Sequence, residues 1–316
     1  MVRQDLGRIG VLMGGVSEER EISLKSGRAV YNTLKEAGFD VIPVDIDKPE
    51  IRENIKKIRS SGIDVAFIAL HGRFGEDGTI QKILEDLNIP YTGSGVEASR
   101  LALNKVLSRR YFIEWGLNVP EYRVIEKKEF NKNLLILEEL KFPLVIKPST
   151  QGSSIGLFIV ENRTELLKAV EEAFNFDDRI IIEQYIKGRE VTVGILEEQP
   201  LPIIEIIPKK RFFDYEAKYT PGLTEYIIPA EIEEEITKQI RDSALRAHKA
   251  LGCYGFSRVD MILKEDYVYV LEVNTIPGLT ETSLLPKAAR AIGIDFLELC
   301  LRLIDSAYRK SRLLIK

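Results

Sequence analysis

The segment YGFSRVDMILKEDYVYVLEVNTIPGLTETSL, residues 254–284, carries most of the information about the fold. Residues 256–263 and 267–274 are both rich in Val, Ile, Leu and aromatic side chains, and the polar tripeptide Lys264-Glu265-Asp266 separates them. Two such runs joined by a short polar connection are typical of a β-hairpin. We therefore expect two antiparallel strands here.

The register of this hairpin decides which side chains share a face. A three-residue connection would place Asp260 opposite Val270 and Arg258 opposite Glu272. Because side chains alternate between the two faces of a strand, the two acids, Arg258 and Asn274 then project from one side. The other side is wholly apolar and needs a core to cover it: Val259, Met261, Leu263, Tyr267, Tyr269, Leu271 and Val273. A two-residue connection would instead put the two acids on opposite faces.

An Asp, a Glu and an Asn on one face, without His or Cys, make an all-oxygen site. Asp260, Glu272 and Asn274 are therefore predicted ligands of Mg²⁺ or Mn²⁺, which prefer oxygen and keep waters and substrate phosphates as further ligands. Two plainer interpretations stay open, a half-solvated hairpin whose acids face water and a simple ion pair with Arg258. The Pro277-Gly278 turn beyond the hairpin favours the metal site, since it can offer backbone N–H groups beside it.

Bulk composition limits the class of protein. The 316 residues are enough for two or three domains, and 45% hydrophobic with 30% charged residues is the composition of a soluble globular protein. A net charge of −4 gives no support for a nucleic-acid or lipid surface, and the sequence has no stretch typical of a membrane span or signal peptide. We expect a cytoplasmic protein without nucleic-acid or membrane partners, whose cysteines, Cys253 and Cys300, pack rather than react.

Residues 1–97 are predicted to form a small doubly wound α/β domain, because strand-like and helical segments alternate along them. The expected elements are a strand at 8–13, a helix at 17–37 with Ser17 as its N-cap, a strand at 41–44, a helix at 50–61 and a strand at 63–70. Ligands in such domains bind beyond the carboxyl ends of the strands. This rule draws attention to loops 14–20 and 71–79.

These two loops contain candidate binding residues. Gly14-Gly15 is not a dinucleotide fingerprint, because the third glycine is missing. Glu18, Glu19 and Glu21 follow, and for each of them alone the better interpretation is that it favours the helix N-terminus through the dipole, although an acid in a strand-end loop can also hold a substrate amine. The second loop begins at His71 and places three glycines among charged residues, which indicates close approach to a ligand. A lone histidine, by contrast, is more often structural.

A second region begins near residue 98. Residues 97–115 are predicted to form one amphipathic helix that carries Lys105. A strand at 142–147 ends in Lys147 and is followed by the loop STQGSSIG, residues 149–156, and a further strand. This is not a P-loop, which would open a helix, but its N–H groups and hydroxyls can cradle a polyphosphate. The alternative is a flexible surface hairpin. The ammonium group of Lys147 at the end of an apolar strand argues against this alternative.

The remaining segments complete a nucleotide-site prediction. Residues 179–184 and 191–196 are predicted strands, and an edge of free backbone groups there can bind an adenine, with Glu190 near a ribose hydroxyl. Residues 209–224 form a long polar loop with aromatics, and loops of this length are usually functional lids or disordered. Helices are expected at 231–251 and within 285–315.

Six segments, taken in order, resemble the D-alanine–D-alanine ligases of the ATP-grasp superfamily. They are GGVSEEREISL at 14–24, HGRFGEDGT at 71–79, PYTGSG at 90–95, KPSTQGSSIG at 147–156, DYEAKY at 214–219, and R-V-D with LEVNTIPGLTETSLLP between 258 and 286. Each segment is weak alone, but their joint order is highly specific. The resemblance covers the chain essentially from end to end.

The resemblance implies an α/β (α+β) ATP-grasp fold with domains at 1–97, 98–185 and 186–316, in which the central and C-terminal sheets hold ATP between them. Implied ATP contacts come from Lys105, Lys147, Ser153, Ser154, Glu183, Gln184, Tyr185, Ile186, Glu190, Lys218 and Asn274. Asp260, Glu272 and Asn274 would hold two Mg²⁺ ions, in agreement with the predicted hairpin face, and neutralise charge during γ-phosphoryl transfer. A homodimer is also implied.

The implied reaction joins two D-alanines for peptidoglycan synthesis. The carboxylate of one D-alanine becomes an acyl phosphate, which the amine of the second attacks. Arg258 and the N–H of Gly278 would stabilise the developing oxyanion, and a lid would keep water from the acyl phosphate. The implied catalytic residues are Glu19, Ser153, Tyr219, Arg258 and Gly278, of which the first three form a hydrogen-bonded triad. The implied substrate contacts are Glu19, His71, Lys218, Arg258, Gly278, Ser283 and Leu284.

Two residues bear on the second substrate in this resemblance. Tyr219 favours D-alanine over D-lactate, and Thr282 departs from the histidine of some family members. Two other functions stay open at this point. A different ATP-grasp ligase would share the nucleotide residues and differ around Glu19, Tyr219 and Ser283. A nucleotide-binding regulatory module without turnover would lack metal or phosphate residues, and none is missing from this sequence.

Overall fold

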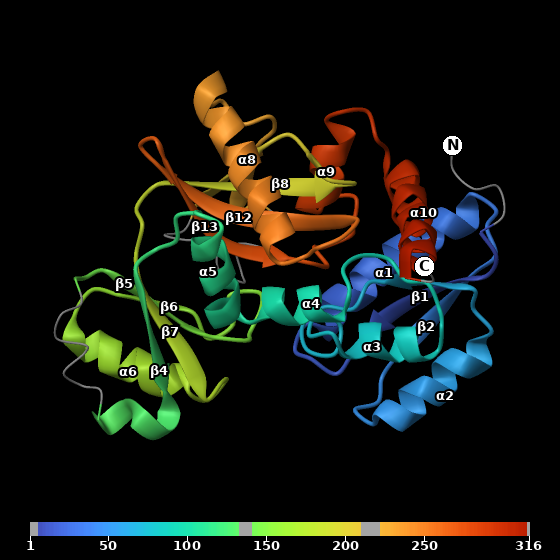
Figure 1. Ribbon diagram of the computed structural model, residues 1–316, viewed down its shortest axis with the longest axis horizontal. Helices are drawn as coiled ribbons and strands as arrows, with labels where there is room; N and C mark the ends of the chain where they lie inside the picture. Colours follow the sequence, from blue (N-terminus) through green and yellow to red (C-terminus); the bar gives the residue numbers. More distant parts are fainter. Residues whose placement is uncertain (1–5, 133–140, 210–221, 315–316) are drawn as a thin grey trace.

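The computed structural model describes residues 6–132, 141–209 and 222–314, whose strands form three sheets (Figure 1). Lys218 and Tyr219, two of the predicted site residues, lie outside these ranges. The first sheet lies at one end of the molecule and the second sheet at the opposite end, and the third sheet lies between and above them in the view of Figure 1.

The first sheet is parallel, with the order β2-β1-β3. Its strands are β1 (Ile9–Gly14), β2 (Val41–Ile46) and β3 (Val65–Ile68), and they alternate with helices α1 (Arg20–Glu36), α2 (Ile51–Ser61) and α3 (Thr79–Asp86). Alternate side chains of β1 enter two separate cores: Val11 packs in the core that includes α1, whereas Leu12 packs in the core that includes α2 and α3. Both faces of the sheet are therefore covered, and the prediction of a doubly wound unit is confirmed.

The C-terminal helix returns to this first sheet. The chain ends in α9 (Leu284–Arg290) and α10 (Phe296–Leu314), and α10 packs beside α1 and β3 (Figure 1). Leu299, Cys300, Leu303 and Ile304 of α10 are fully buried in the same core as β1. The two ends of the chain thus share one hydrophobic core, and Cys300 packs as expected.

The second sheet is antiparallel, with the order β4-β7-β5-β6. It consists of β4 (Tyr122–Glu126), β5 (Leu144–Pro148), β6 (Phe158–Val160) and β7 (Arg179–Gln184), with α6 (Arg163–Ala173) against one face and the 3₁₀ helix η1 (Lys127–Lys132) after β4. The prediction of a free backbone edge along 179–184 is wrong for the strand itself. β7 pairs with β4 on one side and with β5 on the other.

Two helices precede this sheet where the sequence suggested one. They are α4 (Val96–Leu103) and α5 (Lys105–Glu114), and they meet at Asn104. The Asn104 side chain accepts hydrogen bonds from the N–H groups of Val106 and Leu107, both at 3.1 Å. Asparagine is a strong N-cap residue because its side-chain oxygen satisfies such orphan donors. The break therefore places Lys105 in the first turn of a new helix.

The third sheet has the order β11-β10-β8-β12-β13, and β9 pairs with β8 beside this path. Its strands are β8 (Arg189–Leu196), β9 (Gln199–Pro200), β10 (Ile204–Pro208), β11 (Thr224–Ile227), β12 (Phe256–Lys264) and β13 (Tyr267–Asn274). Helix α8 (Glu234–Ala250) covers one face, and its core includes the buried Cys253.

The β12–β13 hairpin has a two-residue connection, Glu265-Asp266, because Lys264 pairs with Tyr267. The predicted three-residue connection is therefore wrong. The two acids nevertheless face each other, since a β-bulge after Asp260 shifts the register so that Asp260 pairs with Glu272 and Met261 with Val270. Directly opposite residues of an antiparallel pair share a face. The predicted common face of the acids is confirmed, by a bulge that the sequence did not reveal.

The two-residue connection and the bulge together change which residues of β13 enter the core. Val268 and Val270 are buried there, whereas Tyr267 is 60% exposed and Leu271 lines a cavity on the other face. The expectation that Tyr267, Tyr269 and Leu271 point into the core is therefore wrong. A shift of one residue moves side chains to the opposite face of a strand, so the bulge divides β13 into two stretches of opposite alternation.

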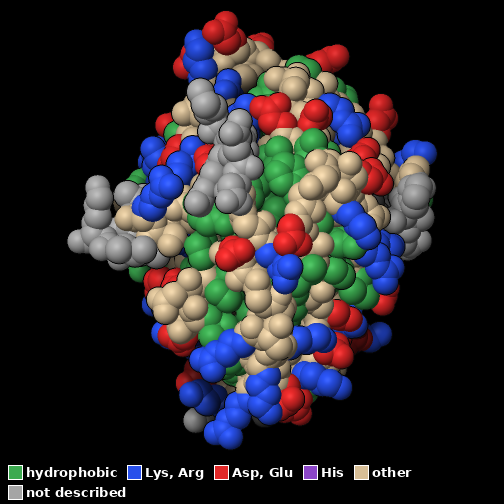
Figure 2. Space-filling view, turned by 90° about the vertical axis from the view of Figure 1, so that its right-hand side faces the viewer, with side chains coloured by type: hydrophobic (Ala, Val, Ile, Leu, Met, Phe, Trp, Pro, Cys, Tyr) green, Lys and Arg blue, Asp and Glu red, His purple; other side chains and the backbone are tan. Residues whose placement is uncertain are grey.

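The outer surface gives two further observations. Of the helices that the structure describes, none is both long enough and apolar enough to cross a lipid bilayer. Figure 2 shows one end of the molecule, where hydrophobic side chains occupy the middle of the face and both acidic and basic side chains surround them.

Candidate active site

Two adjoining cavities gather most of the residues singled out by the sequence. The first cavity, of about 490 Å³, lies between the second and third sheets. The second cavity, of about 420 Å³, lies between the loops of the first sheet and the turn after β13. Both volumes are typical of small-molecule sites. Gly152 and Glu272 line both cavities, so these residues mark where the two meet.

The first cavity has a row of buried charges in its wall. Glu183 accepts a hydrogen bond from Lys147 Nζ at 2.6 Å and another from Arg109 Nη2 at 2.6 Å. Burial opposes the ionisation of Glu183, but Arg109 and Lys147 outweigh this effect and lower the pKa of its carboxyl. Burial also lowers the pKa of Lys147, against the opposing charge of Glu183. Both oxygens of Glu183 are thus engaged by cations, which fixes the position of Lys147.

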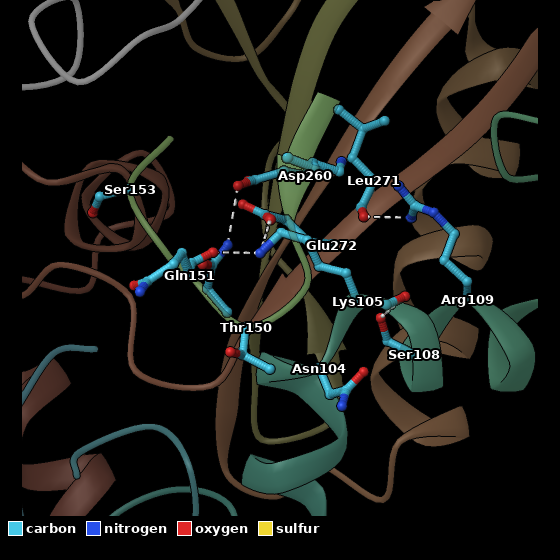
Figure 3. Close-up of polar contacts among 12 residues, drawn as sticks. Asn104, Lys105, Ser108, Arg109, Thr150, Gln151, Ser153, Asp260, Leu271 and Glu272 are labelled. Carbon is cyan, nitrogen blue, oxygen red and sulfur yellow. Dashed lines mark hydrogen bonds and ion pairs between the residues drawn. The ribbon is translucent and has the colours of Figure 1, made fainter. Parts of the chain in front are cut away.

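Lys105 reaches the same cavity from the start of α5. Its N–H donates to Ser149 O at 2.9 Å, and its Nζ donates to Gln151 O at 2.5 Å and lies 3.7 Å from Glu272 Oε2. Figure 3 shows the side chain of Lys105 extending between Gln151 and Glu272. A second ammonium group therefore lies where the loop after β5 meets the hairpin.

The loop 149–156 is anchored at its beginning by Asp177. Asp177 Oδ2 accepts hydrogen bonds from Ser149 Oγ, Thr150 N and Thr150 Oγ1, at 3.1, 2.9 and 2.8 Å. Farther along, Ser153 and Ser154 have φ angles of 50° and 60°. Such left-handed backbone conformations are unusual for residues other than glycine. The loop is therefore held in a specific shape, which argues against the interpretation as a flexible surface hairpin.

The polar face of the hairpin is centred on Asp260. Arg258 forms a bidentate ion pair with it, at 2.8 Å from Nε and 2.7 Å from Nη2. Thr192 Oγ1 donates to Asp260 Oδ1 at 2.6 Å, and Asn274 Nδ2 donates to Oδ2 at 3.0 Å. The ion pair that the sequence left open is present. It is compatible with a ligand site, since Asp260 and Glu272 still line the first cavity together.

The donor set fits a hard cation. Asp260 and Glu272 are paired across the two strands, and Asn274 adds an amide oxygen on the same face. Within residues 6–132, 141–209 and 222–314, no group of three or more His, Cys, Asp or Glu side chains could hold a metal ion. Two carboxylates are sufficient for Mg²⁺, which usually keeps several waters and binds substrate phosphates. Any such site therefore needs the substrate as a ligand.

Glu19 connects the second cavity to the loop 149–156. Its Oε1 accepts a hydrogen bond from Ser153 Oγ, which joins two members of the predicted triad. Glycines surround this carboxylate: a Cβ on Gly72 would lie 2.6 Å from Glu19 Oε2, and a Cβ on Gly152 would lie 3.0 Å from it. We expected the glycine-rich loop 71–79 to approach a ligand closely. At Gly72 the group that the loop approaches is the carboxylate of Glu19. Helix α1 begins at Arg20 with Glu19 in the N-cap position, so the prediction of Ser17 as the N-cap is wrong, and the Ser17 hydroxyl instead donates to His71 O.

His71 links the first sheet to the turn after β13. Its Nε2 lies 3.1 Å from Ser26 Oγ, and Ser26 Oγ accepts a hydrogen bond from Leu279 N at 3.3 Å. Burial lowers the pKa of His71 to about 4. At neutral pH the imidazole is therefore uncharged, and it holds the turn in place through Ser26.

The turn itself contains Gly278, Thr280 and Ser283. Ser283 Oγ lies 2.8 Å from Thr280 Oγ1 and accepts a hydrogen bond from Thr280 N at 3.1 Å. A Cβ on Gly278 would lie 2.9 Å from Ser283 Oγ, so a side chain at this position would displace that hydroxyl. The turn therefore presents a backbone segment and a fixed hydroxyl group to the second cavity.

The predicted site residues divide between the cavities. The first cavity is lined by Lys105, Lys147, Ser154, Glu183, Gln184, Tyr185, Ile186, Glu190, Asp260 and Glu272. The second cavity is lined by Glu19, His71, Ser153, Arg258, Glu272, Asn274, Gly278, Ser283 and Leu284. Asn274, which was predicted to contact both nucleotide and metal, thus lines the second cavity and not the first.

Four polar residues near these cavities were not singled out in the sequence. Arg109, Asp177 and Thr192 contact the residues described above, and Glu76 lines the second cavity. Burial, followed by the charge of Glu19, raises the pKa of Glu76 well above its ordinary value. Only Glu76 had a local signal, as an acid within the glycine-rich loop 71–79. The other three become recognisable only through their spatial contacts.

Comparison with known proteins identifies the family. The model described as "D-ala D-ala ligase C-terminus" matches residues 112–305, and the model described as "D-ala D-ala ligase N-terminus" matches residues 8–57 and 49–94. The chain belongs to the D-alanine–D-alanine ligase family. Relatives with the name D-alanine–D-alanine ligase include one from Syntrophotalea carbinolica, 48% identical over 97% of this chain and 99% of its own length. Another, from Desulforudis audaxviator, is 46% identical over 96% and 99%.

Solved structures of this family have the same ATP-grasp fold. The D-alanine–D-alanine ligase of Bacillus anthracis complexed with ATP superposes with a TM-score of 0.86 and 36% identity, over 97% of this chain and 99% of that chain. The VanG D-Ala:D-Ser ligase of Enterococcus faecalis superposes with a TM-score of 0.81 and 33% identity, over 95% and 99%. The expected α/β ATP-grasp fold is confirmed.

Proposed function

We propose that this chain ligates two D-alanines to D-alanyl-D-alanine at the expense of ATP, releasing ADP and phosphate, for peptidoglycan precursor synthesis. The observation that carries the proposal is the position of Glu272 in the walls of both cavities. A phosphoryl donor in the first cavity and a carboxylate acceptor in the second would meet at this residue. Family membership and the ATP-complexed relative from Bacillus anthracis support the same reaction.

In this proposal ATP occupies the first cavity. Lys105 and Lys147 contact its phosphates, together with the loop that carries Ser153 and Ser154. Gln184, Tyr185 and Ile186 contact the adenine, and Glu190 contacts the ribose; all four line this cavity. Because Glu183 is engaged by Lys147 and Arg109, we assign it the role of holding Lys147 toward the phosphates.

Asp260, Glu272 and Asn274 would hold two Mg²⁺ ions, with Mn²⁺ as a substitute. When bound, the ions would neutralise charge on the transferring phosphoryl group. Arg258 orients Asp260 through its two hydrogen bonds. Thr192 orients the same carboxylate from the neighbouring strand.

Both D-alanines would occupy the second cavity. Glu19 would bind the ammonium group of the first, whose carboxylate takes the γ-phosphoryl group and becomes an acyl phosphate. The amine of the second attacks the acyl carbon, phosphate leaves, and the amine loses its proton. Arg258 and the N–H of Gly278 would stabilise the oxyanion of the tetrahedral intermediate. Ser283, Leu284 and Lys218 would bind the second substrate.

Tyr219, Ser153 and Glu19 would close the site as a triad, of which the Ser153–Glu19 hydrogen bond is present in the described residues. His71 would support the substrate turn through Ser26 as a neutral imidazole. We further propose domains at 1–97, 98–185 and 186–316, a homodimer, and a location in the cytoplasm, where ATP is available. Sedimentation of the purified chain tests the oligomeric state.

Phosphate release from ATP and Mg²⁺ tests the reaction. The purified chain is assayed with D-alanine, with L-alanine, and with D-alanine plus D-serine or D-lactate, and the products are identified by mass. We expect release that depends on D-alanine, with D-alanyl-D-alanine as the main product. A mixed product with D-serine or D-lactate would retain the mechanism and change the second substrate. Release that no D-amino acid stimulates would contradict the substrate assignment.

A further inference from the structure

Arg109 occupies an unusual position between the second and third sheets. It lies on α5, its side chain is 0% exposed, and its guanidinium reaches both sheets. One nitrogen, Nη2, donates to Glu183 Oε2 on β7 at 2.6 Å. The other, Nη1, donates to the carbonyl oxygen of Val270 on β13 at 3.2 Å and to that of Leu271 at 2.5 Å, and Figure 3 shows the contact with Leu271. A single side chain thus contacts β13, which carries Glu272, and Glu183 of β7, which in turn binds Lys147 of the neighbouring strand β5.

The contact on β13 falls at the bulge. In a regular strand, consecutive carbonyl groups point to opposite edges, so one donor group cannot reach two of them. Here Leu271 is the extra residue between the pairs Met261–Val270 and Asp260–Glu272. A bulge leaves backbone groups without ladder partners. Arg109 supplies the donor for both carbonyls on this outer edge of the sheet.

The bulge in turn decides the orientation of Glu272. The hairpin connection has two residues, and without the extra residue Asp260 would face Leu271 rather than Glu272. Stabilising the two carbonyls therefore stabilises the register in which the acids share a face. Because the same guanidinium binds Glu183, it also fixes this register relative to Lys147, which Glu183 holds at 2.6 Å.

Only arginine meets these requirements. Its planar group offers five N–H donors in a fixed arrangement and stays charged under all ordinary conditions. A lysine at this position has a single ammonium group, which the charge of Glu183 attracts. A lysine would therefore keep Glu183 neutralised and leave the carbonyls of the bulge without their donor.

We propose that Arg109 is a positioning residue that holds the Leu271 bulge, and with it Glu272, in register with Lys147 across the nucleotide cavity. This inference rests on the proposed function, since it assigns Glu272 to the metal and Lys147 to the phosphates. Arg109 itself would contact neither the metal nor the phosphates. Its effect must therefore appear as a change in how metal and nucleotide bind together.

The test measures the dissociation constant of a fluorescent ATP analogue with and without Mg²⁺, by fluorescence titration of the full chain. The quantity of interest is the ratio of the two constants, which we call the Mg²⁺ gain. For Arg109→Lys we expect a Mg²⁺ gain that is about tenfold smaller than in the wild type, and metal-free affinity within about threefold of it. In steady-state assays kcat should fall by about tenfold to a hundredfold, with KM for D-alanine unchanged.

Two further variants separate this role from a general loss of structure. Arg110→Lys, at the adjacent exposed position of α5, should behave as the wild type in every readout. Glu183→Gln should weaken metal-free nucleotide binding through Lys147 and retain the Mg²⁺ gain, because Arg109 still binds the bulge. If Arg109→Lys does not fold, Arg109→Met is compared in the Glu183→Gln background, where no carboxylate is left unpaired. That double variant should lose the gain relative to its Glu183→Gln parent.

Several outcomes would overturn the inference. The first is a Mg²⁺ gain in Arg109→Lys that equals the gain in Arg110→Lys. The second is a Mg²⁺ gain that falls as much in Glu183→Gln as it does in Arg109→Lys. If Mg²⁺ does not change the nucleotide affinity of the wild-type chain, both this inference and the metal part of the proposed function are overturned. A wild-type chain with a normal Mg²⁺ gain but no D-alanine-dependent phosphate release overturns only the substrate assignment.

Discussion

The two cavities are built in different ways. In the first, the charged residues lie on strands and at a helix start, and buried opposite charges already compensate them, as in the row Lys147, Glu183 and Arg109. In the second, Glu19, His71, Ser153 and Ser283 come from four separate loops, beside polar residues of α1 and of the β12–β13 hairpin. Several of the contacts there use hydroxyl groups: Ser153 to Glu19, Ser26 to His71, and Ser283 to Thr280.

This difference has a functional consequence. Polyphosphate carries several charges, so its site needs cations held rigidly by regular secondary structure. A small amino acid offers one ammonium and one carboxylate group, and its site can be formed by loops that position single hydrogen-bonding groups. We therefore expect substitutions around the first cavity to change nucleotide or metal binding, and substitutions around the second to change KM for D-alanine.

The largest effect is expected for Glu272, which belongs to both cavities. Glu272→Gln removes one of the two carboxylates of the proposed metal site while keeping the shape of the side chain. We expect kcat for phosphate release to fall by about a thousandfold, because the charge on the transferring group loses its compensation. Glu265→Gln, in the exposed turn of the same hairpin, is the matched control and should retain activity. Similar kcat values for the two variants would contradict the role of Glu272.

The second prediction concerns Gly72, whose added Cβ would lie 2.6 Å from Glu19 Oε2. Gly72→Ala should displace that carboxylate and raise KM for D-alanine by about tenfold to a hundredfold, by loss of a charged hydrogen bond. Nucleotide affinity should stay within about twofold of the wild type. Steady-state kinetics and fluorescence titration measure the two quantities.

Gly38→Ala provides the control for Gly72→Ala. Gly38 also has a positive φ angle, of 85°, but an added Cβ there would meet nothing within 4 Å. Both variants should lose about 1–2 kcal/mol of unfolding free energy from backbone strain. If Gly38→Ala raised KM for D-alanine as much as Gly72→Ala, strain would explain the effect and the contact with Glu19 would not.

The third prediction tests the anchor of the loop 149–156. Asp177→Asn replaces the carboxylate that accepts three hydrogen bonds from Ser149 and Thr150. We expect KM for ATP to rise by about tenfold, since an amide group cannot accept all three bonds at one charged oxygen. KM for D-alanine should change little. Asp178→Asn, whose side chain is 87% exposed, should leave both constants unchanged. An effect on D-alanine alone would contradict the division between the cavities.

The smallest effect concerns stability and pH. The pKa of His71 is lowered to about 4 by burial, from an unfolded value near 6.5. A lowered histidine pKa means that the unfolded chain binds the proton more readily, so the stability contributed by the neutral form is present above pH 6.5 and is lost as the pH falls toward 4. The slope in this window should be at most about 1.4 kcal/mol per pH unit. Denaturant unfolding of wild type and His71→Gln measures it.

In His71→Gln the free energy of unfolding should vary less over that pH window than in the wild type. The difference between the two curves isolates His71, because all other titrating groups are common to both proteins. Parallel curves would mean that His71 titrates normally in the folded chain. Above pH 7, the pH dependence of activity should be the same in both proteins.

Local patterns pointed to many of the residues that line the proposed nucleotide cavity. Lys147 was recognisable because an ammonium group follows an apolar strand and precedes a glycine-rich loop. Asp260 and Glu272 were recognisable because strand alternation places them on one side of a hairpin. The helix break at Asn104 also had a local signal, since asparagine is a preferred N-cap, but the apolar pattern across it suggested one continuous helix.

Other features depended on distant parts of the chain. The predicted hairpin connection was one residue too long, and the predicted pairs Asp260–Val270 and Arg258–Glu272 were wrong, but the Leu271 bulge returned the two acids to one face. The strand sequence carries no signal for this bulge. The hydrogen bonds to its carbonyl groups come from Arg109, which is far away in the sequence. Likewise, α10 packs beside α1 and β3 through long-range burial of apolar side chains, which its own periodicity cannot assign to a particular sheet.

The sequence by itself therefore determined the classes of structure and chemistry: a parallel α/β unit, an antiparallel hairpin with an all-oxygen face, and a glycine-rich loop able to cradle phosphate. These depend on side-chain periodicity and residue type, which are local properties. The tertiary structure alone decided which residues meet, from the register of Glu272 to the contact between Glu19 and Ser153. The physical reason is that a buried charge or backbone group must find a partner, and that partner can lie anywhere in the chain.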